Sequence, residues 1–180
     1  MRKVLFILGE LSDLDVEWMT AHGTKQRVAQ GANLIREGEA MGAMFIVLDG
    51  HFRVWIDSDG QKELARLGSG EILGEISFVD SRPPFASVDA VEDSTVLSIP
   101  RSDLDEKLRQ DPGFAARFYR AIAVFLSDRL RSTVGRLGYG KAGSMEDEES
   151  MGDELDPALL DTVHLAGARF DRMLKKLMGA

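Results

Sequence analysis

The chain has 180 residues, 44% of them hydrophobic and 29% charged, which is enough to bury the core of one compact domain with an appendage. It has no cysteine, which excludes a disulfide framework, a cysteine metal site and a thiol nucleophile. A formal net charge of −8 argues against general nucleic-acid binding, because lysine and arginine supply most of the non-specific affinity for phosphates. The apolar run at residues 4–8 is too short for a signal peptide or a membrane span, so a cytoplasmic protein without membrane insertion is expected.

Residues 1–25 are expected to form an N-terminal helical segment. Ser12 and Asp15 have the spacing of a capping box, in which each side chain accepts a hydrogen bond from the other residue's backbone. Leu11 and Val16 have the spacing of a hydrophobic staple around the same helix start. A short helix is therefore predicted directly after this pair.

Residues 26–100 consist of short β-type runs separated by turn residues. The clearest hairpin turns are Asp49-Gly50 and Asp59-Gly60, because both pairs tolerate positive φ. This spacing of strands predicts a closed or sandwiched β structure rather than an α/β sheet. The expected strands lie at residues 26–29, 34–36, 44–48, 52–57, 62–67, 71–73, 86–90 and 95–99.

Residues 101–137 are expected to form C-terminal helices. Ser102 and Asp105 indicate one helix start, and Asp111 followed by Pro112 indicates the start of a longer helix. One face of that helix carries an apolar stripe that consists of Ile122, Leu126, Leu130, Val134 and Leu137. The stripe could pack only on its own domain, but its length favours a homodimer seam.

The composition changes abruptly after the long helix. Residues 138–156 predict an acidic flexible linker, because glycines are followed by seven acidic residues and no basic one between residues 146 and 156. Residues 157–180 have apolar residues at helical spacing and predict an amphipathic C-terminal helix. We expect this tail to fold back over the arginine-rich face of the long helix or to cross to a partner subunit. A solvated spacer is the alternative for the linker.

The segment 68–88 contains the most informative pattern. Gly74 and Glu75 open a short apolar stretch, and Arg82 follows within a dozen residues. A glycine lets backbone N–H groups approach phosphate oxygens, a carboxylate accepts from a ribose hydroxyl, and a guanidinium neutralises the phosphate. The pattern thus indicates a site for a phosphorylated sugar. The alternatives are a sharp turn at Gly74, a helix cap by Glu75 and an exposed loop charge at Arg82.

Two segments carry a resemblance to a known family. Residues 36–50 resemble the glycine-marked hairpin of the cyclic nucleotide-binding domain family, and residues 68–88 resemble its phosphate-binding cassette. The family includes catabolite activator proteins and the regulatory subunits of cyclic-AMP-dependent protein kinase. The resemblance covers residues 12–137 and implies a mainly β fold. This fold is an eight-stranded antiparallel β-roll, a jelly-roll-like double-stranded β-helix, with an N-terminal helix and a long C-terminal helix.

The resemblance also implies a function and a set of site residues. It implies a stand-alone bacterial-type regulatory domain that binds cyclic AMP, cyclic GMP or a cyclic dinucleotide and needs no cofactor. The family's phosphate-pairing arginine aligns with Pro84, while Arg82 lies two residues earlier. Proline lacks an N–H and fixes φ, which stiffens this loop and puts ordinary nucleotide binding in question. The predicted ligand-binding residues are Gly74, Glu75, Ile76, Ser77, Arg82, Ala86 and Ser87.

Two functions therefore stay open. The first is a sensor that transmits nucleotide occupancy to the C-terminal helices, and the second is a ligand-independent dimerisation or protein-interaction module with an unknown partner. His22, His51 and His164 have no metal-ligand spacing and no nucleophile turn beside them, so no catalytic residue and no metal are expected. Direct DNA binding is not expected either, because the one helix predicted after the acidic segment cannot make a winged helix-turn-helix.

Overall fold

The computed structural model describes residues 4–57, 61–136 and 157–179. The helices are α1 (Val4–Glu10), α2 (Asp13–His22), α3 (Glu75–Asp80), α4 (Arg101–Gln110), α5 (Pro112–Arg136) and α6 (Pro157–Met178). The strands are β1 (Thr24–Val28), β2 (Asn33–Ile35), β3 (Ala43–Asp49), β4 (Phe52–Ile56), β5 (Lys62–Leu67), β6 (Ile72–Leu73), β7 (Ser87–Ala90) and β8 (Ser94–Pro100). Each predicted strand is confirmed, with ends that differ by no more than two residues.

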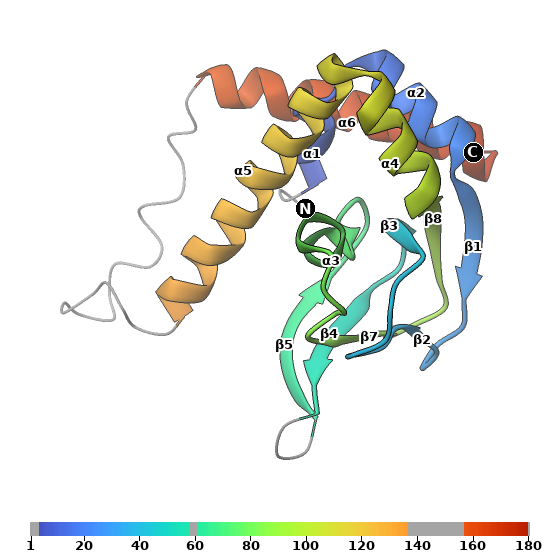
Figure 1. Cartoon of the computed structure of the whole chain (residues 1–180), viewed down its shortest axis with the longest axis vertical. Helices are drawn as coiled ribbons and strands as arrows, with labels where there is room; N and C mark the ends of the chain where they lie inside the picture. The colour runs from blue at the N-terminus through green and yellow to red at the C-terminus, as the bar shows by residue number, and fades with distance from the viewer. Residues whose placement is uncertain (1–3, 58–60, 137–156, 180) are drawn as a thin grey trace.

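The strands form two four-stranded antiparallel sheets that face each other as a β-roll (Figure 1). The strand order is β1-β8-β3-β6 in the first sheet and β2-β7-β4-β5 in the second. Strand β3 shows why an unbroken apolar run fits here, because successive side chains point to opposite faces of a strand. Phe45 and Val47 lie in the core between the sheets, whereas Met44 and Ile46 lie in a second core beneath the helices.

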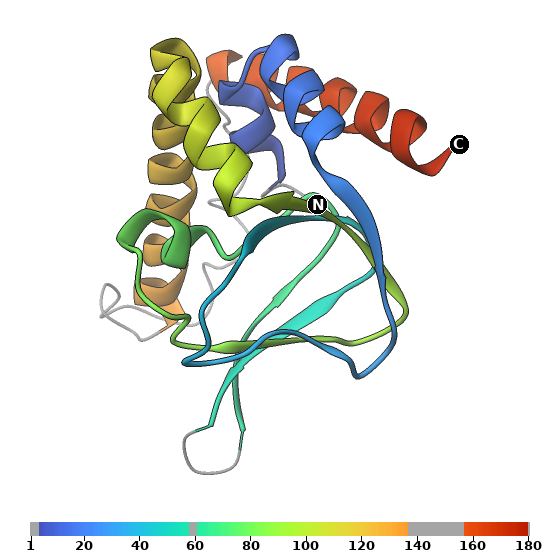
Figure 2. The same cartoon turned by 45° about the vertical axis from the view of Figure 1, so that its right-hand side comes forward.

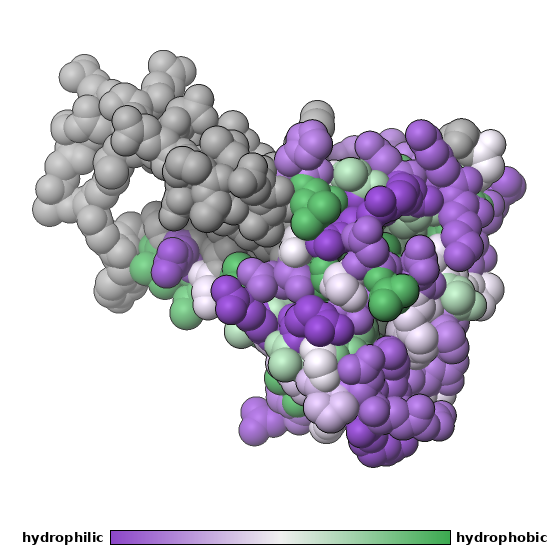
Figure 3. Space-filling view, turned by 90° about the horizontal axis from the view of Figure 1, so that it is seen from above, coloured by the Kyte–Doolittle hydropathy of each residue, from purple (hydrophilic) through white to green (hydrophobic). Residues whose placement is uncertain are grey.

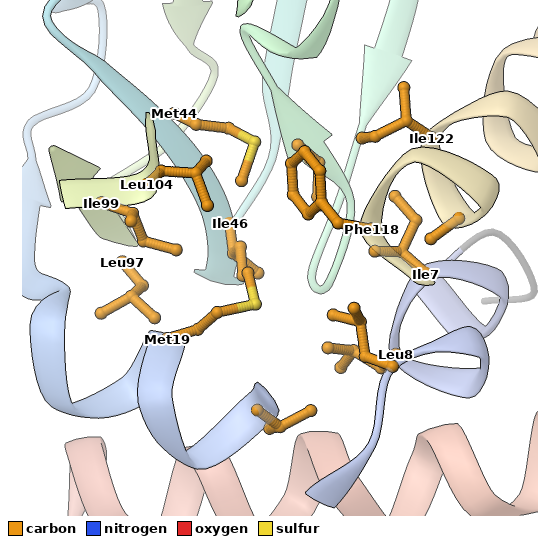
Figure 4. Close-up of a cluster of buried hydrophobic side chains, with 14 of the residues drawn as sticks. Ile7, Leu8, Met19, Met44, Ile46, Leu97, Ile99, Leu104, Phe118 and Ile122 are labelled. Carbon is orange, nitrogen blue, oxygen red and sulfur yellow. The ribbon is translucent and has the colours of Figure 1, made fainter. Parts of the chain in front are cut away.

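Helices α1, α2, α4, α5 and α6 gather at one end of the β-roll, and α3 lies between the roll and α5 (Figure 2). Figure 4 shows the second core, in which side chains from several helices meet those of β3 and β8. Met19 from α2, Leu8 from α1 and Phe118 from α5 are buried there against Ile46 and Leu97. Seen from above, this helical end is mostly hydrophilic, with scattered apolar residues (Figure 3).

Two of the three predicted helix starts are confirmed. The Asp15 carboxylate accepts from the Ser12 N–H at 2.7 Å, and the Asp15 N–H donates to the Ser12 hydroxyl at 3.2 Å. Asp111 accepts from the Phe114 N–H at 2.8 Å. The capping pair predicted at Ser102 and Asp105 is wrong.

The reason is that α4 begins at Arg101, two residues before the first helical position that an N-cap at Ser102 would give. Strand β8 runs directly into the helix through Pro100, which takes the N-cap position with φ −57° and has no side-chain acceptor. Ser102 then falls inside the first turn, and its hydroxyl donates to the Asp103 carboxylate instead. A proline at the end of a strand therefore overrides the capping preference of the nearby serine.

The sequence predicts a helical segment over residues 1–25 with a helix start at Ser12, but it does not indicate α1 as a separate helix before that start. In the structure Ile7 and Leu8 bury this helix against the rest of the helical end. The predicted C-terminal helix is present as α6, and it packs against α1 and α2. The linker predicted at 138–156, Leu137 and the Asp59-Gly60 turn lie outside the described residues. No described helix combines the length and apolarity required to cross a membrane.

Candidate functional site

Gly74 joins β6 to α3 in a conformation that requires glycine. Its φ of 87° and ψ of 5° lie in the left-handed region, which side-chain-bearing residues seldom adopt. A Cβ atom here would also collide with the terminal methyl group of Met41. The sharp turn and the close approach of Met41 both explain the glycine, with or without a bound ligand.

A hollow of about 410 Å³, including its open mouth, lies beside this turn at the end of the inner core of the β-roll. Ligand pockets in proteins commonly have volumes of about 300–1,000 Å³. The enclosed part of this hollow is about 60 Å³, so a ligand has to widen it to be buried there. Its walls come from β2, β4, β5, β6, β7, α3 and two loops. The lining residues are Ile35, Met41, Val54, Leu67, Leu73, Gly74, Glu75, Ile76, Ser77, Pro84, Phe85, Ala86 and Val88.

The two segments that resemble the family's motifs meet at this hollow. The N–H of Gly38 donates to the Pro84 carbonyl oxygen at 2.8 Å. The N–H of Glu37 donates to the Ser87 hydroxyl at 3.1 Å. The loop between β2 and β3 is therefore held against the loop that leads into β7, although about fifty residues separate them in the chain.

The structure brings most of the predicted ligand-binding residues together. Those that line the hollow are Gly74, Glu75, Ile76, Ser77 and Ala86. Arg82 does not line it, because its side chain is exposed and its N–H donates to the Asp80 carboxylate at 3.0 Å. Ser87 faces a different, outer groove beside Trp55 and Asp89. Contact of any of these residues with a ligand stays a prediction.

Besides the core residues that the strands contribute to the wall, sequence reasoning missed the lining residues Met41 and Phe85. Met41 lies within the glycine-marked hairpin segment, and Phe85 directly follows Pro84, so both stood inside the segments that carry the resemblance. Phe85 is 57% exposed and therefore forms an aromatic part of the mouth. The signal that could have found it is an aromatic residue in a polar loop, where no core contact requires one.

The electrostatics of the hollow differ from those expected of a phosphate site. Among the described lining residues Glu75, with 2% of its surface exposed, carries the one charge, and none is lysine or arginine. Pro84, buried in the wall, supplies neither a charge nor an N–H. The nearby cation, Arg101, donates instead to the carbonyl oxygens of Ser77 at 3.0 Å and Phe78 at 3.3 Å. Arg101 thus caps the C-terminal end of α3.

Helix α3 also connects the hollow to the long helix. Ile76 and Ser77 line the hollow, and the next residue, Phe78, packs edge to face on Phe118 of α5 with ring centroids 5.8 Å apart. The Arg101 guanidinium lies 5.2 Å from the centre of the Phe78 ring. One short helix therefore touches the hollow, α4 and α5.

The predicted dimerisation stripe divides into two halves. Ile122 is buried in the core beneath the helices, and Leu126 packs against it while partly exposed. Farther along α5, Leu130 is 65% and Val134 37% exposed. The first half of the stripe thus packs on its own domain, and the second half leaves an apolar surface.

Comparison with known proteins bears on the whole β-roll. Residues 25–111 match the family described as "Cyclic nucleotide-binding domain". This part of the chain belongs to that family. The match ends at the start of α5, so it includes both sheets, α3 and the hollow.

Individual relatives agree with this assignment. The "Cyclic AMP receptor protein" of Thermus thermophilus is 31% identical over 123 residues, which are 67% of this chain and 55% of that protein. "Lysophospholipase nte1" of Aspergillus fumigatus is 26% identical over 138 residues, 74% of this chain but 9% of that protein. A crystal structure of a cyclic nucleotide-binding domain from Methylobacillus flagellatus has a TM-score of 0.69 at 22% identity, covering 79% of this chain and 85% of that one.

These relatives confirm the predicted fold class and family. The chain spans about half of the first relative and less than a tenth of the second, so the activities of those whole proteins do not transfer to it. Across the described residues, no three histidine, aspartate or glutamate side chains are grouped to hold a metal ion.

Proposed function

We propose that this chain is a non-enzymatic regulatory domain that senses a small ligand in the hollow beside Gly74 and transmits its occupancy to α5. The observation that carries the proposal is the contact of Phe78 with Phe118. Because α3 forms both the wall of the hollow and this contact, a ligand that shifts Ile76 or Ser77 also shifts a residue packed on the long helix. A ligand changes a conformational equilibrium only by such differential contacts.

The family makes a cyclic nucleotide the first ligand to test, with cyclic AMP, cyclic GMP and cyclic dinucleotides as candidates. Gly74 and Glu75, which align with the family's glycine and glutamate, support this choice because both line the hollow. The absence of a cation from the described lining residues limits the affinity. An arginine–phosphate contact contributes about 1.5–3 kcal/mol, so its loss weakens binding by about ten- to a hundredfold.

Calorimetric titration with the three nucleotides tests the sensing proposal. Binding is expected to be weak, and to be lost in Glu75→Gln but retained in Glu17→Gln, which removes an exposed carboxylate on α2. Hydrogen exchange of residues 112–126 measures the transmission, and the ligand is expected to slow it. Unchanged exchange under saturating ligand would disprove transmission to α5.

A ligand-independent interaction module is the second candidate function. The observation that favours it is the hollow itself, which holds Pro84 and no described cation where a phosphate would require one. In this alternative the exposed apolar half of α5 is the interaction surface, and it forms a homodimer or binds an unidentified protein partner. No heat with any small ligand, together with a stable dimer, would favour the module over the sensor.

The homodimer can be tested on its own. Leu130→Glu places a charge on the exposed part of the stripe, and we expect it to convert a dimer into a monomer in light scattering. Leu14→Glu is the matched control, because Leu14 is 76% exposed on α2, outside the stripe. A wild-type chain that is already monomeric at high concentration would rule out this seam.

A further inference from the structure

Arg101, the first residue of α4, is bonded to a wall of the hollow beside Gly74. Its guanidinium donates to the carbonyl oxygen of Ser77 at 3.0 Å, and Ser77 itself lines the hollow. We infer that Arg101 is a positioning residue that holds α3 where the hollow is narrow and thereby lowers the affinity of the hollow for its ligand. This inference rests on the proposed sensing function and concerns the regulation of that same site.

A ligand has to move one of the walls, because the enclosed part of the hollow is about 60 Å³. The strands that line it are hydrogen-bonded to neighbouring strands within the two sheets. The loop before β7 is held by the Gly38 N–H, which donates to the Pro84 carbonyl oxygen. Helix α3 has only six residues and lies outside both sheets, between the β-roll and α5 (Figure 2). It is therefore the wall that can move without breaking a strand ladder.

Both ends of α3 have backbone conformations that suit a hinge. Gly74 before the helix and Ser81 after it lie in the left-handed region, with φ of 87° and 59°. Serine seldom adopts this conformation, so the turn after α3 depends on a contact that stabilises it. Arg101 makes such a contact, because its guanidinium donates to the Ser81 hydroxyl at 3.0 Å. Arg101 thus holds the turn about which α3 would pivot.

Arg101 is itself anchored and does not follow α3 freely. Its backbone N–H donates to the Gly42 carbonyl oxygen at 2.9 Å, which fixes it to the loop between β2 and β3. Its guanidinium also donates to the Phe78 carbonyl oxygen at 3.3 Å and lies 5.2 Å from the centre of the Phe78 ring. Moving Ser77 outward therefore disrupts several contacts with a fixed group. A ligand binds more weakly when the state that accepts it is rarely populated, so these contacts lower the apparent affinity.

Arg101→Gln in the full chain tests the inference first without a ligand. Glutamine removes the charge and the forked donor, so amide hydrogen exchange of residues 78–80 in α3 is expected to become about three- to tenfold faster. Arg109→Gln, at an exposed position on the same helix α4, is the matched control and should leave this exchange unchanged. Unchanged exchange of α3 in Arg101→Gln would overturn the inference. An equal acceleration throughout the two sheets would overturn it too, because Arg101 would then only stabilise the fold.

Calorimetry with cyclic AMP provides a second readout, which a purely structural role would not move in the same direction. Arg101→Gln is expected to raise the affinity about three- to tenfold, because the narrow state of the hollow is then less populated. Loss of a merely structural contact would lower the affinity or leave it unchanged, and either result would contradict the inference. Arg101→Lys keeps a charge but not the fork that reaches both Ser77 and Phe78, so a smaller gain is expected.

The outcomes separate this inference from the sensing proposal. Faster exchange of α3 in Arg101→Gln, without heat from any nucleotide, would support the positioning of α3 by Arg101 and disprove nucleotide sensing. Unchanged exchange of α3, with clear binding of cyclic AMP, would overturn the role of Arg101 and leave the sensor intact. Faster exchange together with tighter binding of cyclic AMP supports both.

Discussion

The hollow of the β-roll and the helical end of the molecule use charge in opposite ways. In the helical end, the half-exposed Arg117 guanidinium donates to the buried Asp15 carboxylate at 2.6 Å, and the buried Arg169 donates to two backbone carbonyl groups of α1. In the hollow, the described lining offers one carboxylate and no cation. Arg117 and Arg169 therefore fasten helices to one another, whereas Pro84 and no lysine or arginine stand among the described lining residues of the hollow.

The largest effect is expected where a buried arginine holds α6. Arg169 donates to the carbonyl oxygens of Leu8 at 2.8 Å and Gly9 at 3.1 Å, close to the C-terminal end of α1. In Arg169→Ala both oxygens lose this partner, which should lower the free energy of unfolding by about 3 kcal/mol. Chemical denaturation followed by circular dichroism measures the loss.

Arg172→Ala is the matched control for that substitution. Arg172 pairs with the same Asp13 carboxylate as Arg169, at 3.0 Å, but its side chain is 59% exposed. Exposed ion pairs contribute little, so we expect almost no change in the free energy of unfolding. Equal losses in the two variants would mean that α6 is held by the charge pair on Asp13 and not by the carbonyl groups of α1.

The next largest effect is expected when a cation is added to the hollow, which would then resemble the helical end in having an arginine. Pro84→Arg places a guanidinium at the position predicted to align with the family's arginine, and cyclic AMP affinity is expected to rise by about ten- to a hundredfold, or about 1.5–3 kcal/mol. The substitution leaves the backbone carbonyl of residue 84 in place, so the hydrogen bond from the Gly38 N–H is retained. Calorimetry measures the gain.

Pro84→Gln serves as the control for Pro84→Arg, because it also removes the proline but adds no charge. We expect it to leave cyclic AMP affinity nearly unchanged. An equal gain in both variants would assign the effect to loop flexibility rather than to charge, and the electrostatic account of the hollow would fail.

A smaller effect tests how closely the hollow is packed at Gly74. Gly74 and Gly38 both have positive φ, 87° and 78°, so an alanine at either position should cost about 1 kcal/mol in backbone strain. A Cβ at Gly74 also meets Met41, whereas a Cβ at Gly38 meets no described atom within 4 Å. The Met41 methyl group is the end of a flexible side chain that can move aside, so Gly74→Ala should be at most about 1 kcal/mol more destabilising than Gly38→Ala in thermal unfolding.

The Met41 contact can be isolated in a second background. In Met41→Ala the methyl group that covers Gly74 is absent, so the two glycine substitutions should then cost nearly the same. A difference that persists in this background would show that Met41 is not what restricts position 74.

The sequence predicted the β-roll well because its signals are local. The turn signal at Asp49-Gly50 and the apolar run of β3 depend on neighbouring residues alone, and Gly50 indeed has φ 91°. The same holds for the capping box at Ser12. The predicted hairpin at Asp49-Gly50 is wrong, however, because β3 and β4 lie in different sheets and do not pair. The candidate site was predicted in part, since Gly74 to Ser77 lie in one continuous segment of chain.

The remaining features depend on contacts between distant parts of the chain. Helix α1 spans seven residues, too short for a clear helical period, and its position depends on Arg169, about 160 residues later. Met41 reaches the hollow only because the loop before β3 folds against the loop before β7. No local sequence pattern predicts contacts between distant segments, so the roles of these residues could be found only from the structure.

The smallest effect concerns the dependence of helix packing on pH. Burial alone would raise the pKa of Asp15, but hydrogen bonds from Arg117 and Ser12 outweigh it and hold that pKa below its ordinary value. A carboxyl group with a lowered folded-state pKa stabilises the fold above its unfolded pKa, about 3.9, and that contribution is lost as the pH falls further.

Asp15→Asn should therefore cost about 1 kcal/mol at pH 7, and this cost should shrink toward zero below about pH 4. The measurement is the free energy of unfolding of both proteins at pH 7, 5 and 3. Asp171→Asn, which alters an exposed carboxylate on α6, provides the baseline. A cost of Asp15→Asn that stays constant down to pH 3 would mean that Asp15 acts through its shape and not through its charge. The ion pair of Arg117 with Asp15 would then contribute less to the stability of the helical end than the contrast with the hollow implies.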